Sequence, residues 1–362
     1  MTWRTIWSAD GTARQLNQAP LPERIDRGTL VIELDLAEIG LPNDGEPVLR
    51  LARHLEPKRM FSIERGQDVR LHLLRRHGPE VSHLSVGLGL EPISGILRLT
   101  YHWDAARGRS LLTAENLTRG SIRQHDGTDA LPMLRDELES LLAPGDSGRH
   151  VAIDWIGLAD HWHTVGPMPG FAPGTVIATP EGPRPIETLN PGDLVLTADD
   201  GPLPVLWQGR VAVPGMGRMR PVRLIAPYHG LTRDLRINPG QRLALSGPEV
   251  EHHYGEDEVL VEARHLVNGR TAVWDCEGAL ETYHGLLFDR HTVIDANGIR
   301  TESLYLGRLT RNPDLARTTA PAALGRIREL PDHATPVRPG LRDHDAFALN
   351  LSRLKSRAPL AA

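Results

Sequence analysis

The chain has 362 residues, of which 40% are hydrophobic and 24% are charged, with a formal net charge of −5. This length favours two domains over one, and the weak, interspersed negative charge argues against nucleic acid or an anionic membrane as a partner. The single cysteine, Cys276, excludes an intramolecular disulfide and any multi-cysteine zinc site.

The N-terminal segment lacks the apolar core of a signal peptide, and no apolar run is long enough to span a membrane. We therefore expect a cytoplasmic location by default, with export by a non-classical route left open. Glycine (35) and proline (29) are numerous, which is typical of a turn-rich β protein. The predicted fold class is mainly β.

Short runs of β-forming residues recur through the first part of the chain, after a polar segment at 1–27 that we expect to be an arm or a first edge strand. Their spacing, with turns between them, predicts a β-sandwich or jelly roll over 28–160. One amphipathic helix is predicted at 133–142, before Pro144. The predicted strands lie at 29–36, 47–52, 59–63, 68–74, 81–86, 96–103, 110–114 and 150–156.

Residues 161–169 read as a linker because prolines and glycines crowd its end. The stretch that follows, GFAPGTVIATPEGPRPIETLNPGDLVLTADD at 170–200, alternates β-forming residues with Gly/Pro turns. It predicts a strand at 175–179, a turn at 180–182, a return strand that carries Ile186 and Leu189, a corner at 190–193 and a strand at 194–197.

The order of residues in this stretch resembles the opening block of the Hint (Hedgehog/intein) domain in its bacterial stand-alone form. That block reads Cys-Phe-x-Pro-Gly-Thr-x-Ile-x-Thr, then a Gly turn, then Leu-x-x-Gly-Asp-x-Val-x-Thr. Later stretches at 235–245, 259–269 and 283–303 resemble the following blocks in the same order. The residues that fit the first block are Phe171, Pro173, Gly174, Thr175, Ile177, Thr179, Gly182, Leu189, Gly192, Asp193, Val195 and Thr197.

The resemblance implies an all-β Hint fold over 170–307 and a self-cleaving chemistry. In the family, the first Cys attacks the preceding carbonyl and converts the amide to a thioester. A Thr or Ser and a His from the second block assist the departing nitrogen, and a further nucleophile resolves the thioester. Residues 308–362 would follow as a partly disordered tail, in which a terminal helix at 343–356 is possible.

The positions that carry this chemistry depart from the family pattern. Gly170 stands at the nucleophile, Asn238 at the Thr/Ser and Gln241 at the His, and a glutamine cannot transfer a proton near neutral pH. In the last block the first His position is Gly285, although His284 is adjacent. The family positions that remain are Asp289 and His291.

These departures predict a Hint domain that has lost self-cleavage and kept a binding or scaffolding role. Residual autoproteolysis near the Pro169–Gly170 bond is the alternative from the enzyme class. A carbohydrate-binding module with a vestigial Hint partner is a second alternative. Protein splicing is disfavoured because no His-Asn ending precedes Ser, Thr or Cys near Gly307.

The first domain loosely resembles the lectin-like sandwiches that some bacteria place ahead of Hint domains, so a glycan or a protein is its expected partner. No cofactor and no metal are predicted. His161 with His163, and His252 with His253, lack further ligands at a recognisable spacing. Cys276 reads as a small buried residue rather than a relocated nucleophile. Two loop residues of the sandwich, Asp104 and Asn116, could line a calcium or sugar site.

Overall fold

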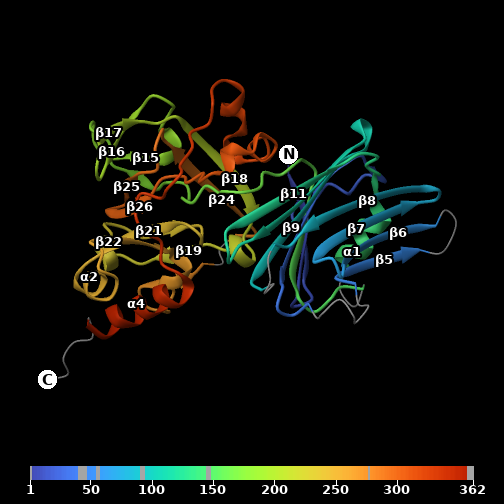
Figure 1. Ribbon diagram of the computed structural model, residues 1–362, viewed down its shortest axis with the longest axis horizontal. Helices are drawn as coiled ribbons and strands as arrows, with labels where there is room; N and C mark the ends of the chain where they lie inside the picture. Colours follow the sequence, from blue (N-terminus) through green and yellow to red (C-terminus); the bar gives the residue numbers. More distant parts are fainter. Residues whose placement is uncertain are drawn as a thin grey trace. The chain divides into compact units, whose positions relative to one another are not determined.

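The computed structural model describes residues 2–39, 47–53, 58–89, 94–143, 148–275 and 278–356. The chain is mainly β, as predicted, and it divides into two compact units, Met1–Val165 and Gly166–Ala362. Figure 1 shows both units. No helix in the described part of the chain is both long and apolar enough to cross a membrane.

The first unit is built on two large antiparallel sheets, one of seven strands and one of four, which are drawn in blue to green in Figure 1. A two-stranded sheet of β12 (Met133–Leu134) and β3 (Arg24–Ile25) accompanies them. The seven-stranded sheet has the order β11 (Ser121–Gly127), β10 (Arg109–Asn116), β9 (Ile96–Asp104), β4 (Arg27–Asp35), β13 (Ile153–Ala159), β1 (Trp3–Ser8) and β2 (Ala13–Gln15). The second has the order β5 (Leu49–Arg53), β6 (Arg59–Arg65), β7 (Arg70–His77) and β8 (Glu80–Gly87).

One hydrophobic core draws side chains from both sheets. Ile32 of β4 and Tyr101 of β9 belong to it together with Phe61 of β6 and Leu84 of β8. Alternate residues of β4 and β9 face this core, as the period of a β-strand requires. The helix α1 (Arg135–Leu142) adds Leu138 and Leu141 to the same core, close to where the sequence predicts a helix.

The expectation of an arm or edge strand at 1–27 is wrong for β1. This strand lies between β13 and β2 in the sheet, and its Trp3, Ile6 and Trp7 are buried. The register shifts between Trp3 and Thr5, so the apolar residues do not alternate strictly. A bulge of this kind removes the two-residue period that would identify a buried strand in the sequence.

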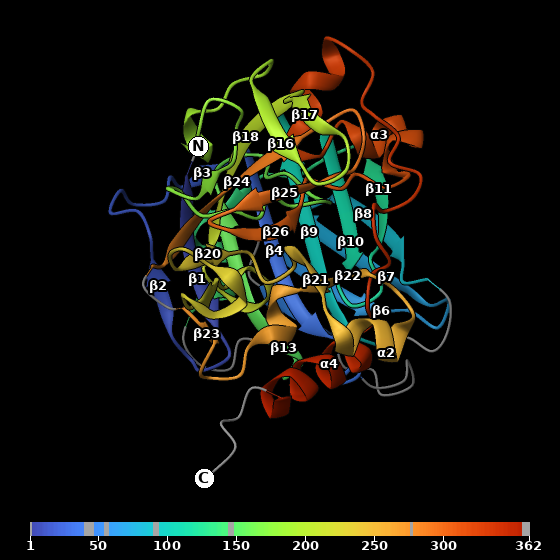
Figure 2. The same ribbon diagram turned by 90° about the vertical axis from the view of Figure 1, so that its left-hand side faces the viewer.

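The second unit contains three groups of antiparallel strands, shown from another side in Figure 2. The largest has the order β15 (Arg184–Pro185), β14 (Val176–Ile177), β25 (Val293–Ala296), β26 (Ile299–Glu302), β21 (Arg242–Ser246) and β22 (Glu258–Glu262), with β16 (Leu194–Thr197) paired to β25 and to β17 (Gly201–Pro204). The others are β18 (Trp207–Pro214) with β24 (Leu280–Leu287), and β20 (Leu235–Ile237) with β19 (Val222–Leu224) and β23 (Ala272–Trp274).

The return strand predicted around Ile186 and Leu189 is instead a 3₁₀ turn, η3 (Ile186–Thr188). Both apolar side chains are buried, and Leu189 N–H donates to Ile186 O at 3.3 Å. A spacing of three residues places two side chains on one side of a 3₁₀ turn, whereas it would place them on opposite faces of a strand. The three-residue spacing of Ile186 and Leu189 therefore indicates the 3₁₀ turn that the structure shows.

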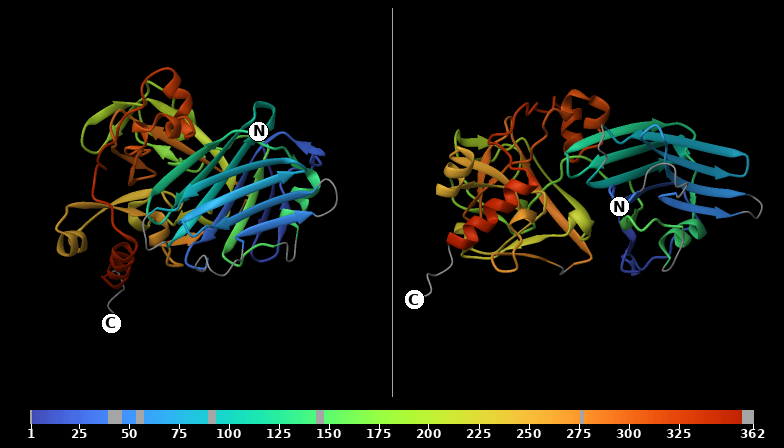
Figure 3. Two further views of the ribbon diagram at one scale, coloured as in Figure 1. Left: turned by 45° about the vertical axis from the view of Figure 1, so that its right-hand side comes forward. Right: turned by 60° about the horizontal axis from the view of Figure 1, so that its bottom comes forward.

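The segment after residue 307 packs on the second unit as far as it is described, and this corrects the expectation of a loose tail. The chain runs through η7 (Leu309–Arg311), α3 (Pro313–Ala316) and η8 (Ala320–Arg326) to α4 (Asp343–Ser356), which is red in Figure 3. Ala346 and Leu349 of α4 are buried in the unit's main core. Leu260 N–H donates to Pro339 O at 2.8 Å, and Leu341 N–H donates to Leu260 O at 2.9 Å.

Candidate functional site

Three segments of the second unit meet at Gly170. Gly170 N–H donates to His284 O at 3.1 Å, and Asn238 N–H donates to Gly170 O at 2.7 Å. The next residue, Phe171, forms bridges to both Ile237 and His284. These bonds bring the first, second and last sequence blocks to one place.

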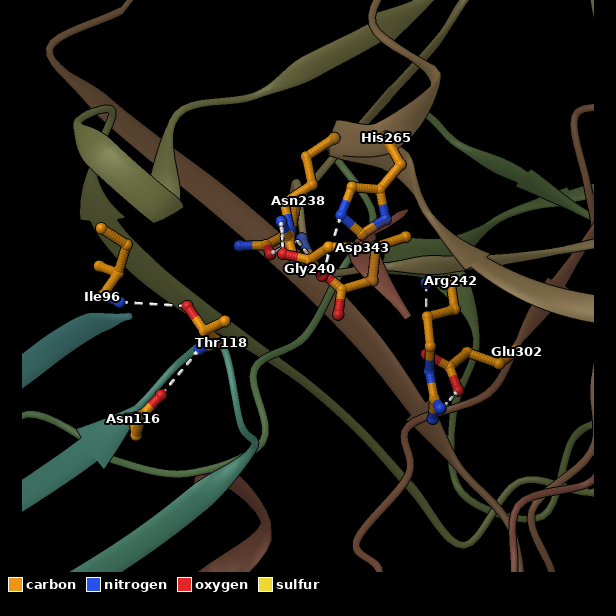
Figure 4. A network of polar contacts seen from close by, with 11 residues as sticks. Ile96, Asn116, Thr118, Asn238, Gly240, Arg242, His265, Glu302 and Asp343 are labelled. Atoms are coloured by element: carbon orange, nitrogen blue, oxygen red, sulfur yellow. Dashed lines mark hydrogen bonds and ion pairs between the residues drawn. The ribbon is translucent and has the colours of Figure 1, made fainter. Parts of the chain in front are cut away.

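The turn between β20 and β21 positions Asn238 and Gln241. Gln241 N–H donates to Asn238 O, and Gly240 N–H donates to the Asn238 side-chain Oδ1, both at 2.9 Å. Figure 4 shows Asn238 folded back over Gly240 in this way. The Asn238 carboxamide oxygen therefore stabilises its own turn.

The Gln241 side chain occupies the space that a side chain on residue 170 would need. A Cβ atom added to residue 170 would lie 1.8 Å from Gln241 Oε1 and 2.6 Å from Gln241 Cδ. Gln241 is held in this position because its Nε2 donates to Glu302 O at 2.9 Å. Residue 170 must be glycine while Gln241 keeps this conformation.

The His284 ring contacts a neighbouring strand rather than Gly170. Gln208 Nε2 donates to His284 Nδ1 at 3.1 Å, and burial lowers the pKa of His284. At the next position, a Cβ on Gly285 would lie 3.1 Å from Pro169 Cβ and 3.2 Å from Pro169 Cα. A side chain at 285 would therefore press directly on the residue before Gly170.

The other two predicted site residues lie outside this meeting point. Asp289 is exposed and pairs with Arg328 at 2.9 Å. His291 is buried, and its Nδ1 accepts a hydrogen bond from Val337 N–H at 2.9 Å. The proton of the neutral ring therefore lies on Nε2, which is 3.0 Å from Glu302 Oε2.

Glu302 was not among the site residues predicted from the sequence. It contacts Gln241 at the meeting point around Gly170 and also lies beside His291. Its Oε1 accepts from Arg242 Nε at 2.7 Å, as Figure 4 shows, and its backbone carbonyl accepts from Gln241. It stands 60 residues after Arg242, so no local spacing could reveal the pair. Glu302 does lie in the last sequence block, 283–303, and this position was the signal that could have marked it as a site residue.

The meeting point can hold its three segments together, but it offers little for peptide cleavage. Gly170 has no side-chain nucleophile, and the hydroxyl of Thr175 donates to Ala172 O at 2.7 Å. Gln241 can donate and accept hydrogen bonds but cannot transfer a proton near neutral pH. Cys276, the other thiol to consider, lies outside the described residues.

The remaining predicted ligands are occupied by structural contacts. Asn116 Oδ1 accepts from Thr118 N–H at 3.2 Å and Thr118 Oγ1 accepts from Ile96 N–H at 3.1 Å, which closes a loop of the sandwich (Figure 4). Asp104 pairs with Arg107 at 2.8 Å. These contacts give both side chains a role in the structure of their loops.

The two histidine pairs considered in the sequence lie in different surroundings. His161 and His163 both pack against the Trp3 ring, with centroids 6.5 and 5.0 Å from it. His252 and His253 lie at the end of α2 (Pro248–Tyr254) and are exposed. Among the described residues, no group of three or more His, Cys, Asp and Glu side chains is arranged to hold a metal ion.

Comparison with known proteins identifies the domain family of the second unit. The model of the Hint domain family matches residues 169–308, so this part of the chain is a Hint domain. This confirms the family resemblance seen in the sequence blocks. Among curated proteins, none matches the chain.

Solved structures similar to this chain include two of intein type. The bacterial intein-like domain from Clostridium thermocellum is 15% identical, with 38% of this chain and 99% of that chain covered and a TM-score of 0.27. The AceL NrdHF class 3 split intein is 14% identical, with 37% and 97% covered and a TM-score of 0.26. The LG1-3 region of the laminin alpha2 chain is 8% identical, with 84% and 56% covered and a TM-score of 0.23.

Proposed function

We propose that the Hint domain of this chain no longer cleaves its own backbone and serves as a structural partner to a binding unit. The observation that carries this proposal is the shared space of Gly170 and Gln241. A cysteine at 170 would place its Cβ 1.8 Å from Gln241 Oε1 and 2.9 Å from Gln241 Cβ, so it would fit only if Gln241 left its present conformation. We interpret the two departures from the family pattern as one coupled change.

A second pair supports the same proposal. Gly285 replaces the family's histidine, and a Cβ there would lie 3.1 Å from Pro169 Cβ. The peptide between Pro169 and Gly170 thus sits beside a backbone position that has no side chain. The adjacent His284 does not take over the role, because its ring contact is with Gln208 on β18.

Cleavage would require three things that this arrangement lacks. A thiol or hydroxyl at 170 must attack the carbonyl carbon of Pro169, a proton must reach the departing amide nitrogen, and a second nucleophile must resolve the ester. The Gly170 N–H already donates to His284 O, a contact that stabilises the intact peptide. The arrangement favours an uncleaved chain.

The intact mass of the full-length protein, followed over days with and without added thiol, tests the proposal. We expect one full-length species in both conditions. Fragments that break between Pro169 and Gly170 would refute it and support residual autoproteolysis instead. The triple variant G170C/Q241H/G285H then asks whether the fold still permits the reaction, with Q241H/G285H as the control that lacks the thiol.

We assign the remaining binding role to the first unit, because it is a compact unit of its own outside the Hint domain. A glycan or a protein is the proposed class of partner. A glycan array probed with the full-length protein separates the two, because a carbohydrate-binding module should retain defined sugars.

A further inference from the structure

The four-stranded sheet of the first unit carries two histidines in direct contact on its outward face. Leu71, Leu73 and Leu84 of β7 and β8 face the core, and His72 and His83 alternate with them. His72 is opposite Ser85 and His83 is opposite Leu74, so the two histidines are diagonal neighbours across the strand pair.

The two imidazole rings meet edge to edge. His72 Nδ1 lies 3.1 Å from His83 Nε2, the ring centroids are 5.3 Å apart, and the ring planes differ by 10°. The centroid separation is close to the nitrogen separation plus the radii of both rings. The two nitrogens therefore lie between the ring centres and point at one another.

Asp68 fixes the tautomer of His72. Its Oδ1 lies 3.0 Å from His72 Nε2, and a carboxylate accepts hydrogen bonds only, so Nε2 carries the proton. In the neutral ring Nδ1 is then unprotonated and presents its lone pair toward His83. A carboxylate on the far nitrogen of a histidine is the usual outer partner of a metal-binding imidazole.

The turn between β6 and β7 is built around this contact. A Cβ on Gly66 would lie 2.4 Å from Asp68 Oδ1 and 2.7 Å from His72 Nε2, so only glycine allows the carboxylate to reach the ring. Glu64 of β6 stands directly opposite His72 and is exposed. Two carboxylates therefore lie beside the histidine pair and would offset the charge of a bound cation.

We propose that His72 and His83 bind a divalent transition-metal ion of the class that includes Zn²⁺ and Cu²⁺, with water in the other coordination positions. Metal–nitrogen bonds of about 2.0–2.1 Å in tetrahedral geometry separate two ligand nitrogens by about 3.3–3.4 Å. The observed 3.1 Å is close to this separation. Each ring would turn by about 35° so that the two lone pairs, which now lie along the line between the nitrogens, converge on one ion beside that line. The proton on His83 Nε2 would move through solvent to Nδ1 of the same ring, which leaves both imidazoles neutral.

This site differs from a ready-made metal centre. No third ligand is arranged for it among the described residues, so the ion would retain exchangeable positions toward solvent. Imidazole nitrogen suits zinc, copper and nickel, whereas calcium and magnesium prefer oxygen. The site is thus expected to discriminate against the two alkaline-earth ions.

Isothermal titration of the full-length protein with Zn²⁺, in a buffer that does not bind the metal, tests the proposal. We expect the H72Q/H83Q variant to lose the tightest site and D68N to bind about ten-fold more weakly. The matched control is H252Q/H253Q, which removes an exposed histidine pair whose ring centroids are 5.0 Å apart. This control should retain the site.

A second readout reports on the rings themselves. The imidazole carbon-bound proton resonances of His72 and His83 should shift together as Zn²⁺ is added, at the ratio of one ion per chain. Unchanged binding in H72Q/H83Q would overturn the proposal. So would loss of the tightest site in H252Q/H253Q alone, because binding would then be adventitious at another pair. Thermal melting of each variant confirms that it is folded.

Discussion

Gln241 Oε1 lies 1.8 Å from the point where a side chain on residue 170 would begin. Gly170 and Gln241 come from sequence blocks 71 positions apart (241 minus 170), yet each restricts what the other can be. The residues at these two positions, which depart from the family pattern, are therefore linked by packing.

Substitution of Gly170 by alanine should reduce the free energy of unfolding by about 1–3 kcal/mol, because the new methyl group overpacks the space of Gln241. The control is G240A, where a Cβ would meet only Asn238 Oδ1 at 3.4 Å. Urea denaturation measures both. Equal effects of G170A and G240A would contradict the argument.

The same pair should be energetically coupled. Q241A removes Oε1 and Cδ, the two nearest obstructing atoms, and leaves the Cβ of residue 241 at 2.9 Å. G170A should therefore cost less in that background than in the wild type. A double-mutant cycle is expected to give a coupling of about 0.5–3 kcal/mol. Additive effects would mean that Gln241 moves aside without cost.

The buried carboxylate of Glu302 should contribute to stability through its hydrogen bond and ion pair with Arg242. E302Q keeps the shape but removes the charge, and we expect a loss of about 2 kcal/mol, since hydrogen bonds to charged groups are the stronger ones. E329Q changes an exposed glutamate of the same unit and should have little effect. Denaturant midpoints compare the two variants.

The docking of α4 should be a stabilising interaction. Leu349 is 1% exposed and lies in the core, whereas Leu351 on the same helix is 43% exposed. We expect L349A to cost about 2–4 kcal/mol and L351A less than about 0.5 kcal/mol. If both variants melt at the wild-type temperature, the helix does not contribute to the stability of the domain.

Acid should destabilise the Hint domain in part through His265. Burial, with help from the charge of Arg264, lowers the pKa of His265 to about 4, although Asp343 acts in the opposite direction. The unfolded chain then binds more protons than the folded one between about pH 6.5 and pH 4, so stability is lost as the pH falls through this window.

The size of this effect is at most about 3 kcal/mol. The free energy of unfolding of H265Q, measured from pH 7.5 to pH 4, should fall less steeply than that of the wild type. H252Q removes an exposed histidine and should follow the wild-type curve. Parallel curves for H265Q and the wild type would rule out His265 as a source of the acid sensitivity.

Local patterns in the sequence predicted the broad architecture. Alternating runs and Gly/Pro turns gave most strands of both units, because these signals arise from neighbouring residues. The first-block residues, and the departures from the family pattern at 170, 241 and 285, could be identified in the sequence for the same reason. Where the local pattern was broken, as at the β1 bulge, or read with the wrong period, as at Ile186 and Leu189, the prediction was wrong.

The sequence by itself determined the mainly β class, the Hint resemblance and the loss of a nucleophile at Gly170, since each depends only on residue type and order. Only the tertiary structure decided that Gln241 fills the space of the missing side chain, that His291 faces Glu302, and that α4 packs into the core. These relationships join residues far apart in the chain, and contacts of that kind leave no periodic trace. They exist because folding brings distant side chains into one close-packed volume.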